Sequence, residues 1–446
     1  MAFKKGDLIL KSEPYAYVLC SEFRGLYCDH CLKKHQELHK CTQCLFSFYC
    51  NKNCQKSAWL DHKQECLNLK RRRPARPTDF VRLIARIIYK LKTLTLPDKY
   101  EEIGNIKRGF EDLMSHVELI KNDPLRLNQY HVISKLIADF VTPDVLPSNQ
   151  ELFEIFGKIT INSYSICDIE MVNIGVGLYL GASMFDHSCR PTATIVFEGP
   201  TLFLKAVVGI SQLSTTKVFI SYLDLLASTY ERKRDLKAQY YFDCMCATCK
   251  DEEKDLITSS ILCPNTNCSQ PTVMKKDSFL CIECGEVKLE KTKQQEISEL
   301  IENCKKVNEE MMQLQKLNKY QEIYDKADDS IQKAKSVLHI FNVHYVRVLD
   351  FAFDACINLS KWETACNLGK QILKSYRYHY GNSHPNYGIH LLKLGKILLY
   401  LEKLLEAEHI LLEASTVIKI THTPTHQLHT ICHELLSQCQ MELQLK

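Results

Sequence analysis

Eight cysteine and histidine positions within residues 28–66 constrain the fold of this chain more than any other feature. They occur in closely spaced pairs: Cys28, Cys31, Cys41, Cys44, Cys50, Cys54, His62 and Cys66. Structural zinc takes four nitrogen or sulfur ligands in a tetrahedron, so eight ligands predict two zinc sites. A segment this short cannot bury a core of its own. Metal binding must therefore supply its folding energy, about 10–16 kcal/mol per site by analogy with zinc-finger peptides.

Two further groups of cysteines extend this pattern. The motif Cys244-x-Cys246-x2-Cys249 offers three ligands and needs a fourth from elsewhere, because three cannot close a tetrahedron. Four more cysteines predict a ribbon-like zinc site from their spacing alone: Cys263, Cys268, Cys281 and Cys284. Most of the 22 cysteines belong to such groups, and in a reducing compartment this spacing indicates metal sites rather than disulfides.

Composition is that of a soluble globular protein, with 45% hydrophobic and 25% charged residues. The 446 residues suffice for two to four domains. The net charge of +4 is small for a chain of this length, so the overall electrostatic field gives no indication of nucleic-acid binding. We find no signal peptide and no apolar run of the roughly 20 residues that a membrane span needs. We therefore expect a cytoplasmic and nuclear protein with no membrane partner.

A basic run, Lys70 to Arg76, follows the finger-like segment directly and is interrupted by Pro74. Such a run is typical of a nuclear address or a nucleic-acid contact. A solvated linker leaving the finger explains it equally well, and the two interpretations stay open.

The rest of the chain alternates between strand and helix patterns. Strands are predicted within residues 1–20 and 172–220, and apolar residues recur at helical spacing within 78–160. From residue 293 onward the chain reads as helical, with an internal repeat of about 42 residues. The repeat aligns Leu317, Leu359 and Leu401, and likewise Lys319, Lys361 and Lys403. Helix pairs stacked in this way resemble tetratricopeptide repeats.

Three short segments lie between these regions: Ile161 to Tyr164, Asp186-His187-Ser188-Cys189, and Ile220 to Leu225. Together with the cysteines at 244–249 they resemble a SET methyltransferase core and its post-SET zinc region. With a zinc module at residues 28–66, the whole chain resembles the SET-and-MYND (SMYD) family.

The resemblance implies an α+β fold in which a MYND finger and a helical insert split a β-rich SET core. The expected order is N-terminal SET strands at 1–27, the finger at 28–66, a linker and helical insert at 67–160, the SET core at 161–225, the post-SET zinc region at 226–250, a zinc-ribbon-like insert at 251–292 and a helical repeat domain at 293–446.

The resemblance also assigns roles to zinc ligands. Ligand pairs in a MYND finger interleave, so one zinc is expected on Cys28, Cys31, Cys50 and Cys54, and the other on Cys41, Cys44, His62 and Cys66. Cys189 is expected to complete the post-SET site with the cysteines at 244, 246 and 249.

At the active site, the resemblance makes Tyr222 the catalytic hydroxyl that orients the substrate amine, with Tyr164 and Tyr240 as walls of the substrate channel. Phe242 is expected under the adenine ring. The residues expected to bind S-adenosylmethionine are Asn162, Ser163, Asp186, His187, Tyr222 and Phe242.

The implied function is S-adenosylmethionine-dependent protein-lysine N-methylation of a histone or non-histone substrate. The reaction needs a neutral amine, and a free lysine is neutral in only about one part in two thousand at pH 7. Desolvation in an aromatic channel lowers that pKa, and alignment of the two reactants supplies much of the remaining rate. No nucleophilic side chain is required.

Two features depart from the family pattern. Asp186 stands where the family has asparagine, and the chain starts at Met1 to Gly6, after the place of a glycine-rich turn that touches the cofactor in the family. A catalytically impaired scaffold that binds partners through the finger and the repeats therefore remains an alternative to the enzyme. Expected partners are a substrate lysine and proline-containing peptides at the finger, with weak or no nucleic-acid binding and a monomeric chain.

Overall fold

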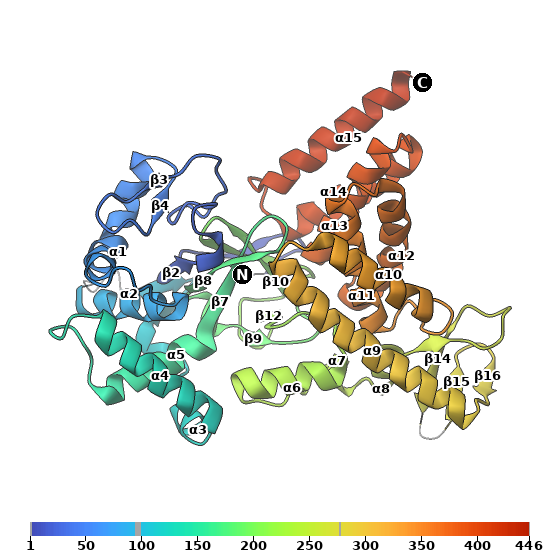
Figure 1. Cartoon of the computed structure of the whole chain (residues 1–446), viewed down its shortest axis with the longest axis horizontal. Helices are drawn as coiled ribbons and strands as arrows, with labels where there is room; N and C mark the ends of the chain where they lie inside the picture. The colour runs from blue at the N-terminus through green and yellow to red at the C-terminus, as the bar shows by residue number, and fades with distance from the viewer. Residues whose placement is uncertain (1, 94–99, 276–277, 446) are drawn as a thin grey trace. The chain divides into compact units, whose positions relative to one another are not determined.

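The structure, a computed structural model, describes residues 2–93, 100–275 and 278–445 (Figure 1). The chain divides into two units, which we describe separately. The first contains Met1–Asp186, Ile195–Val218 and Gln239–Tyr241, and the second contains His187–Thr194, Phe219–Ala238 and Phe242–Lys446.

The β-structure of the first unit consists mainly of two three-stranded sheets. One has the order β1 (Leu8–Ser12), β11 (Thr201–Ala206), β10 (Ala193–Glu198), and the other has the order β2 (Ala16–Leu19), β8 (Asn173–Leu178), β7 (Ser163–Cys167). Strand β2 is buried along its length. A Cβ at Gly175 of β8 would lie 2.8 Å from the Val18 carbonyl oxygen, so glycine allows these strands to approach closely.

The helices of the first unit surround a shared apolar core. They are α1 (Lys52–Arg71), α2 (Asp79–Thr93), α3 (Val117–Lys121), α4 (Pro124–Phe140) and α5 (Asn149–Asn162). Apolar side chains such as Leu83, Ile84 and Ile87 of α2 are completely buried in this core. Ser148 caps α5 in a capping box with Glu151, which fixes where that helix begins.

The linker and helical insert expected at 67–160 also contain β-structure that the sequence analysis did not predict. A hairpin of β5 (Tyr100–Ile103) and β6 (Ile106–Gly109) lies within this segment, turning at Gly104 with φ +58°. Its strands carry charged residues and only one buried apolar position in β5, so their hydrophobic periodicity is weak. Shorter elements of this unit are β3 (His39–Lys40) and β4 (Phe48–Tyr49), with 3-10 turns at Ser21–Phe23, Phe110–Asp112 and Ala182–Met184.

The basic run after the finger has structural partners within the first unit. Arg71 donates to the Phe140 carbonyl, Arg72 to the Asp139 carbonyl and Arg73 to the Cys44 carbonyl, each at 2.9 Å. These arginines therefore hold the end of α1 against α4 and the finger. The run is therefore not a freely solvated linker.

The second unit begins within β9 (Asp186–His187), and the Ser188 amide that follows donates to the Ile220 carbonyl of β12 (Phe219–Ile220) at 2.9 Å. Next come α6 (Thr229–Tyr240), α7 (Ala247–Lys250) and α8 (Glu252–Ile257). A four-stranded antiparallel sheet then follows in the order β13 (Ile261–Leu262), β14 (Pro271–Lys275), β15 (Ser278–Cys281), β16 (Gly285–Val287).

Antiparallel helices fill the rest of the second unit (Figure 1). They are α9 (Lys291–Lys316), α10 (Tyr320–Ala334), α11 (Val343–Asn358), α12 (Trp362–Tyr380), α13 (Pro385–Tyr400), α14 (Leu404–Thr421) and α15 (Gln427–Leu445). Among the helices that the structure describes, none combines the length and apolar character of a membrane span.

The 42-residue repeat in the sequence reappears as a repeated turn geometry. Asn318, Ser360 and Glu402 all adopt a left-handed backbone, with φ of 54°, 57° and 56°. The aligned lysines that follow each turn open the next helix, at Lys319, Lys361 and Lys403. The α+β fold with a C-terminal helical repeat domain is therefore confirmed.

Candidate active site and metal centres

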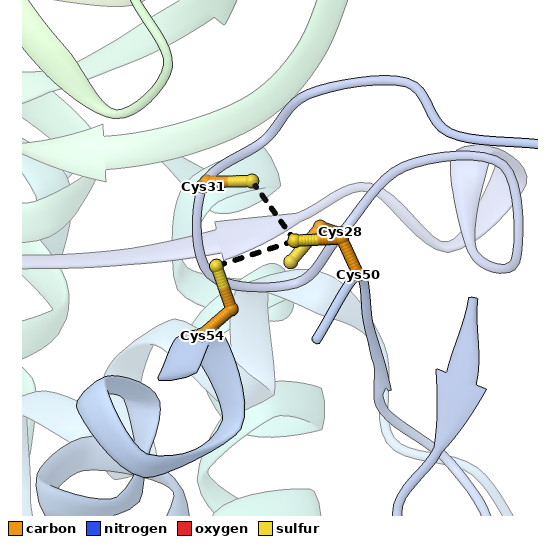
Figure 2. A group of neighbouring side chains, drawn as sticks. All are labelled: Cys28, Cys31, Cys50 and Cys54. Atoms are coloured by element: carbon orange, nitrogen blue, oxygen red, sulfur yellow. Dashed lines mark hydrogen bonds between the residues drawn. The ribbon is translucent and has the colours of Figure 1, made fainter. Parts of the chain in front are cut away.

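The first cysteine group of the finger has the geometry of a tetrahedral zinc site (Figure 2). The Sγ atoms of Cys28, Cys31, Cys50 and Cys54 all lie within 4.8 Å of one another, with Cys31–Cys50 at 3.9 Å and Cys50–Cys54 at 3.3 Å. Zinc–sulfur bonds of 2.3 Å in a tetrahedron separate the sulfurs by about 3.8 Å. Asn51 caps α1 by accepting from the Cys54 amide, which places Cys54 in the first helical turn.

The second group contains Cys41, Cys44, His62 and Cys66, all buried. Cys41 and Cys66 are separated by 3.8 Å between sulfurs, and His62 Nε2 lies 3.6 Å from Cys44 Sγ. The structure therefore gathers the eight residues in the two interleaved sets that the resemblance implied. Both Cys-x2-Cys loops are followed by a leucine with φ 52°, Leu32 and Leu45, so the two loops share one turn geometry.

A buried ion network stands behind His62. Its Nδ1 lies 3.5 Å from Glu65, and Glu65 pairs at 2.6 Å with both Arg82 and Arg86 of α2. Burial opposes the charge of Glu65, but the two guanidinium groups hold the pKa of this carboxyl well below its usual range. A carboxylate on the outer nitrogen of a ligating histidine fixes its tautomer and orientation. Glu65 thus joins the finger to α2.

We expect Glu65→Gln to lower the free energy of unfolding by about 3–5 kcal/mol, because it removes the buried carboxylate that pairs with both Arg82 and Arg86 and leaves Arg82 only the longer contacts to Asp29 and Asp79. Urea unfolding at constant zinc concentration measures the change. Glu37→Gln is the matched control, since Glu37 is an exposed carboxylate in the same finger, and its effect should stay within about 0.5 kcal/mol. Equal stability of the two variants would contradict a role for this network.

A third group of cysteines also converges. The Sγ atoms of Cys189, Cys244, Cys246 and Cys249 lie within 4.8 Å of one another, and Cys189 and Cys249 are 3.5 Å apart. The chain thus brings together residues 60 positions apart in sequence, and Cys189 supplies the fourth sulfur that the segment at 244–249 lacks.

Arg232 of α6 is a residue that the sequence analysis missed. Its side chain is buried, it lines a small cavity with Cys189, and its Nε makes no conventional hydrogen bond within the described part of the chain. Burial lowers the pKa of Arg232, but the thiolates of Cys189 and Cys249 raise it above the usual value. With a zinc ion on the four cysteines, Arg232 would offset the negative charge that four thiolates leave around it.

His187 connects this cysteine cluster to Tyr222. Its Nε2 lies 3.2 Å from Cys189 Sγ, and its Nδ1 accepts a hydrogen bond from the Tyr222 amide at 3.1 Å. Burial, together with the charge of Arg232, lowers the pKa of His187 to about 4. The ring is therefore neutral, with Nδ1 the acceptor and Nε2 the protonated donor towards sulfur.

Three residues predicted at the cofactor site form one aromatic cluster in the second unit. The ring centroid of His187 lies 5.4 Å from that of Tyr222 and 6.1 Å from that of Phe242, and the Tyr222 and Phe242 rings meet edge-on at 6.5 Å. A zinc ion on Cys189 would fix this cluster through His187. The cysteine group and the aromatic cluster therefore form one continuous structure.

The remaining predicted site residues belong to the first unit. Asn162 closes α5 and donates to the carbonyls of Met114 and Lys158 at 2.8 and 2.7 Å. The hydroxyl of Ser163 donates to the Ile159 carbonyl and that of Tyr164 to the Ala182 carbonyl. The side chains of these three residues thus donate to backbone carbonyls of the first unit, where α5 runs directly into β7. The structure also leaves Asp186 exposed and Tyr240 half-buried.

Two residues of the helical repeats hold the segment after Tyr222. Arg347 of α11 donates to the Leu226 carbonyl at 3.0 Å and pairs with Glu231 at 3.1 Å. Tyr380 of α12 donates to Asp224 at 2.7 Å. The sequence analysis missed both, because they lie more than 100 residues from their partners and carry no local motif.

Comparison with known proteins agrees with this geometry. The family model of the MYND finger matches residues 28–66. Over 402 residues the chain is 33% identical to human histone-lysine N-methyltransferase SMYD3, covering 88% of this chain and 83% of that protein. It is 29% identical over 402 residues to N-lysine methyltransferase SMYD2-B of Xenopus laevis, covering 89% of this chain and 85% of that protein.

A plant relative shows a similar match, with 29% identity over 420 residues to histone-lysine N-methyltransferase ASHR1 of Arabidopsis thaliana, covering 89% of this chain and 82% of that protein. The chain therefore belongs to the SMYD family of SET and MYND proteins.

Proposed function

We propose that this protein is an S-adenosylmethionine-dependent protein-lysine N-methyltransferase that acts on a histone or non-histone protein. The observation that carries the proposal is the cluster of His187, Tyr222 and Phe242 beside the Cys189 sulfur. The relatives SMYD3, SMYD2-B and ASHR1 are named as lysine methyltransferases. This support favours the enzyme over the scaffold alternative.

We assign the cofactor to the residues that the resemblance names, because their side chains carry suitable groups. Phe242 offers an aromatic face for the adenine ring, and Asp186 offers an exposed carboxylate for the cofactor's ammonium group. Asn162 and Ser163 would contribute to its amino-acid and adenine ends, alongside His187 and Tyr222. S-adenosylmethionine supplies the methyl group on a sulfonium when it is bound.

The chain's own residues must prepare the lysine. Tyr164 and Tyr240 would form the walls of a channel that excludes water and lowers the pKa of the substrate ammonium, so that it loses its proton before reaction. The hydroxyl of Tyr222 would accept a hydrogen bond from the neutral amine and orient its lone pair. Holding the reactants in line then accounts for much of the rate.

The zinc ligands are part of the proposal. Two ions would be bound by the finger, one by Cys28, Cys31, Cys50 and Cys54 and one by Cys41, Cys44, His62 and Cys66; a third would be bound by Cys189, Cys244, Cys246 and Cys249. We also propose that the finger binds proline-containing peptides and that a monomer suffices for activity, with the SET core at residues 161–225 and the post-SET region at 226–250.

Methyl transfer to protein lysine tests the proposal. The purified, zinc-loaded chain is incubated with labelled S-adenosylmethionine and a mixture of histones and cell proteins, and the products are hydrolysed to amino acids. We expect label in methyl-lysine. Label found only in other amino acids would contradict the proposed reaction. The proposal would also fail if the wild type transferred no more label than the Tyr222→Phe variant.

A further inference from the structure

The sheet of β13 to β16 has too small a core to fold alone. Among the described residues 261–275 and 278–287, the large aliphatic and aromatic side chains that are buried are Ile261 and Phe279. Segments of this size that lack a core depend on a metal or on disulfides. The folding energy of this insert must therefore come from another source.

Four cysteines meet at one end of this sheet. Cys263 follows β13, Cys281 ends β15, and Cys268 and Cys284 lie in the loops after these strands. Cys263 and Cys284 are 3.8 Å apart between sulfurs, and Cys268 and Cys281 are 3.6 Å apart. A disulfide needs about 2.05 Å between sulfurs, whereas tetrahedral zinc separates them by about 3.8 Å. The geometry therefore fits a metal and excludes disulfides in this state.

The same end of the sheet is attached to the connection between α10 and α11. The Leu262 amide donates to the Val337 carbonyl at 2.8 Å, and the His339 amide donates to the Ser260 carbonyl at 3.2 Å. Ile261 and Leu338 form an antiparallel bridge, so residues 337–339 lie as a further strand beside β13.

Contacts close to the cysteines complete this attachment. The His339 ring nitrogen Nε2 lies 3.2 Å from the carbonyl of Ser269, which follows Cys268 directly. Asn342 caps α11 by accepting from the His344 amide, and its side-chain amide donates to the Ser260 carbonyl. Residues next to the cysteine cluster are thus bonded to the backbone on which α11 begins.

We propose that Cys263, Cys268, Cys281 and Cys284 bind one structural zinc ion, and that this ion clamps the α10–α11 connection at residues 337–343. Asn265 supports the site from outside, because its side-chain amide lies 3.5 Å from Cys284 Sγ as a donor. The metal site does not depend on methyl transfer and would be present in an inactive chain.

Metal counting tests the site. We expect the full-length double variant Cys268→Ser/Cys284→Ser to contain one zinc ion fewer than wild type by elemental analysis. Cys167→Ser, a change at a cysteine outside the four clusters, is the control and should keep the wild-type count. An unchanged count in the double variant, or the loss of iron in place of zinc, would overturn the proposal.

Hydrogen exchange tests the clamp in the same variants. The amides of Leu262 and His339 should exchange at least about tenfold faster in the double variant, while exchange in the finger at 28–66 stays unchanged. Loss of the metal without faster exchange at these amides would overturn the clamp and leave only a local metal site.

Alkylation of the wild type provides a readout that does not depend on how the variant folds. Cys284 is solvent-exposed, so burial cannot protect its thiol, whereas a zinc–thiolate bond can. We expect a thiol reagent to modify Cys284 slowly until a chelator is added, and rapidly afterwards. Rapid modification of Cys284 before chelation would contradict the zinc site.

Discussion

Tyr222→Phe should lower kcat for methyl transfer by about 10²–10³-fold, the loss typical of one positioned hydrogen-bonding group at a reacting centre. The variant keeps the aromatic ring and the backbone amide, so the contacts to His187 and Phe242 remain. Only the hydroxyl that would orient the substrate amine is removed. Initial rates at saturating S-adenosylmethionine measure the effect, and zinc content should not change.

Tyr230→Phe provides the matched control for this experiment. Tyr230 is 73% exposed on α6, and the same hydroxyl is removed there. Its rate and stability should equal those of the wild type. A wild-type rate in Tyr222→Phe would remove Tyr222 from the reaction, and an equal loss in both variants would show an effect unrelated to the active site.

The second large effect is expected from Cys189→Ser. Serine cannot replace the thiolate, so the post-SET site would keep three sulfurs and lose its zinc, whose binding is worth about 10 kcal/mol or more of local folding energy in zinc-finger peptides. We expect one zinc ion fewer per chain and rapid proteolysis within residues 242–249. Methyl transfer should also fall, because His187 loses the sulfur that holds its ring beside Tyr222.

Ser188→Ala controls for a change at the neighbouring position. Within the described part of the chain, the Ser188 hydroxyl bonds to the backbone of Arg190, and the substitution removes no sulfur. Zinc content and protease resistance should remain at the wild-type values. Unchanged protease resistance in Cys189→Ser would contradict the role of Cys189 as the fourth ligand.

The sequence predicted those features of the molecule that are formed by residues close together in the chain. Cys-x2-Cys pairs are brought together by a single tight turn, so the groups around Cys28, Cys41 and Cys281 could be predicted from the sequence. The helical repeat could be detected because each copy is also determined by residues that are close together in the sequence. One turn needs a left-handed residue at the same place in each copy, and Ser360 and Glu402 lie 42 positions apart.

Contacts between distant segments could not be predicted in this way. Arg232 resembles any arginine of a polar helix until the fold places it beside Cys189, and Arg347 reaches Leu226 across 121 positions. The hairpin at residues 100–109 was missed because its strands lack the apolar alternation on which strand prediction depends. Such residues acquire their roles only through tertiary packing.

His187 illustrates a related limit. By resemblance, the Asp-His-Ser-Cys motif placed His187 at the cofactor site. In the structure, its side chain also links the cysteine cluster to the segment that carries Tyr222. It contacts the Cys189 sulfur with one nitrogen and the Tyr222 amide with the other. The sequence shows that histidine and cysteine are close, whereas the partner on the other side of the ring lies 35 positions away.

Calorimetric binding of S-adenosylmethionine to the purified, zinc-loaded chain tests the central claim most directly, with Asp186→Asn and Phe242→Ala measured alongside. We expect one cofactor per chain with a dissociation constant of about micromolar order, and at least tenfold weaker binding for Phe242→Ala, a loss of about 1.4 kcal/mol. The affinity of Asp186→Asn shows whether the Asp186 carboxylate strengthens or weakens cofactor binding. The absence of binding in the wild type and in Asp186→Asn, with the zinc ions retained, would contradict the proposed methyltransferase.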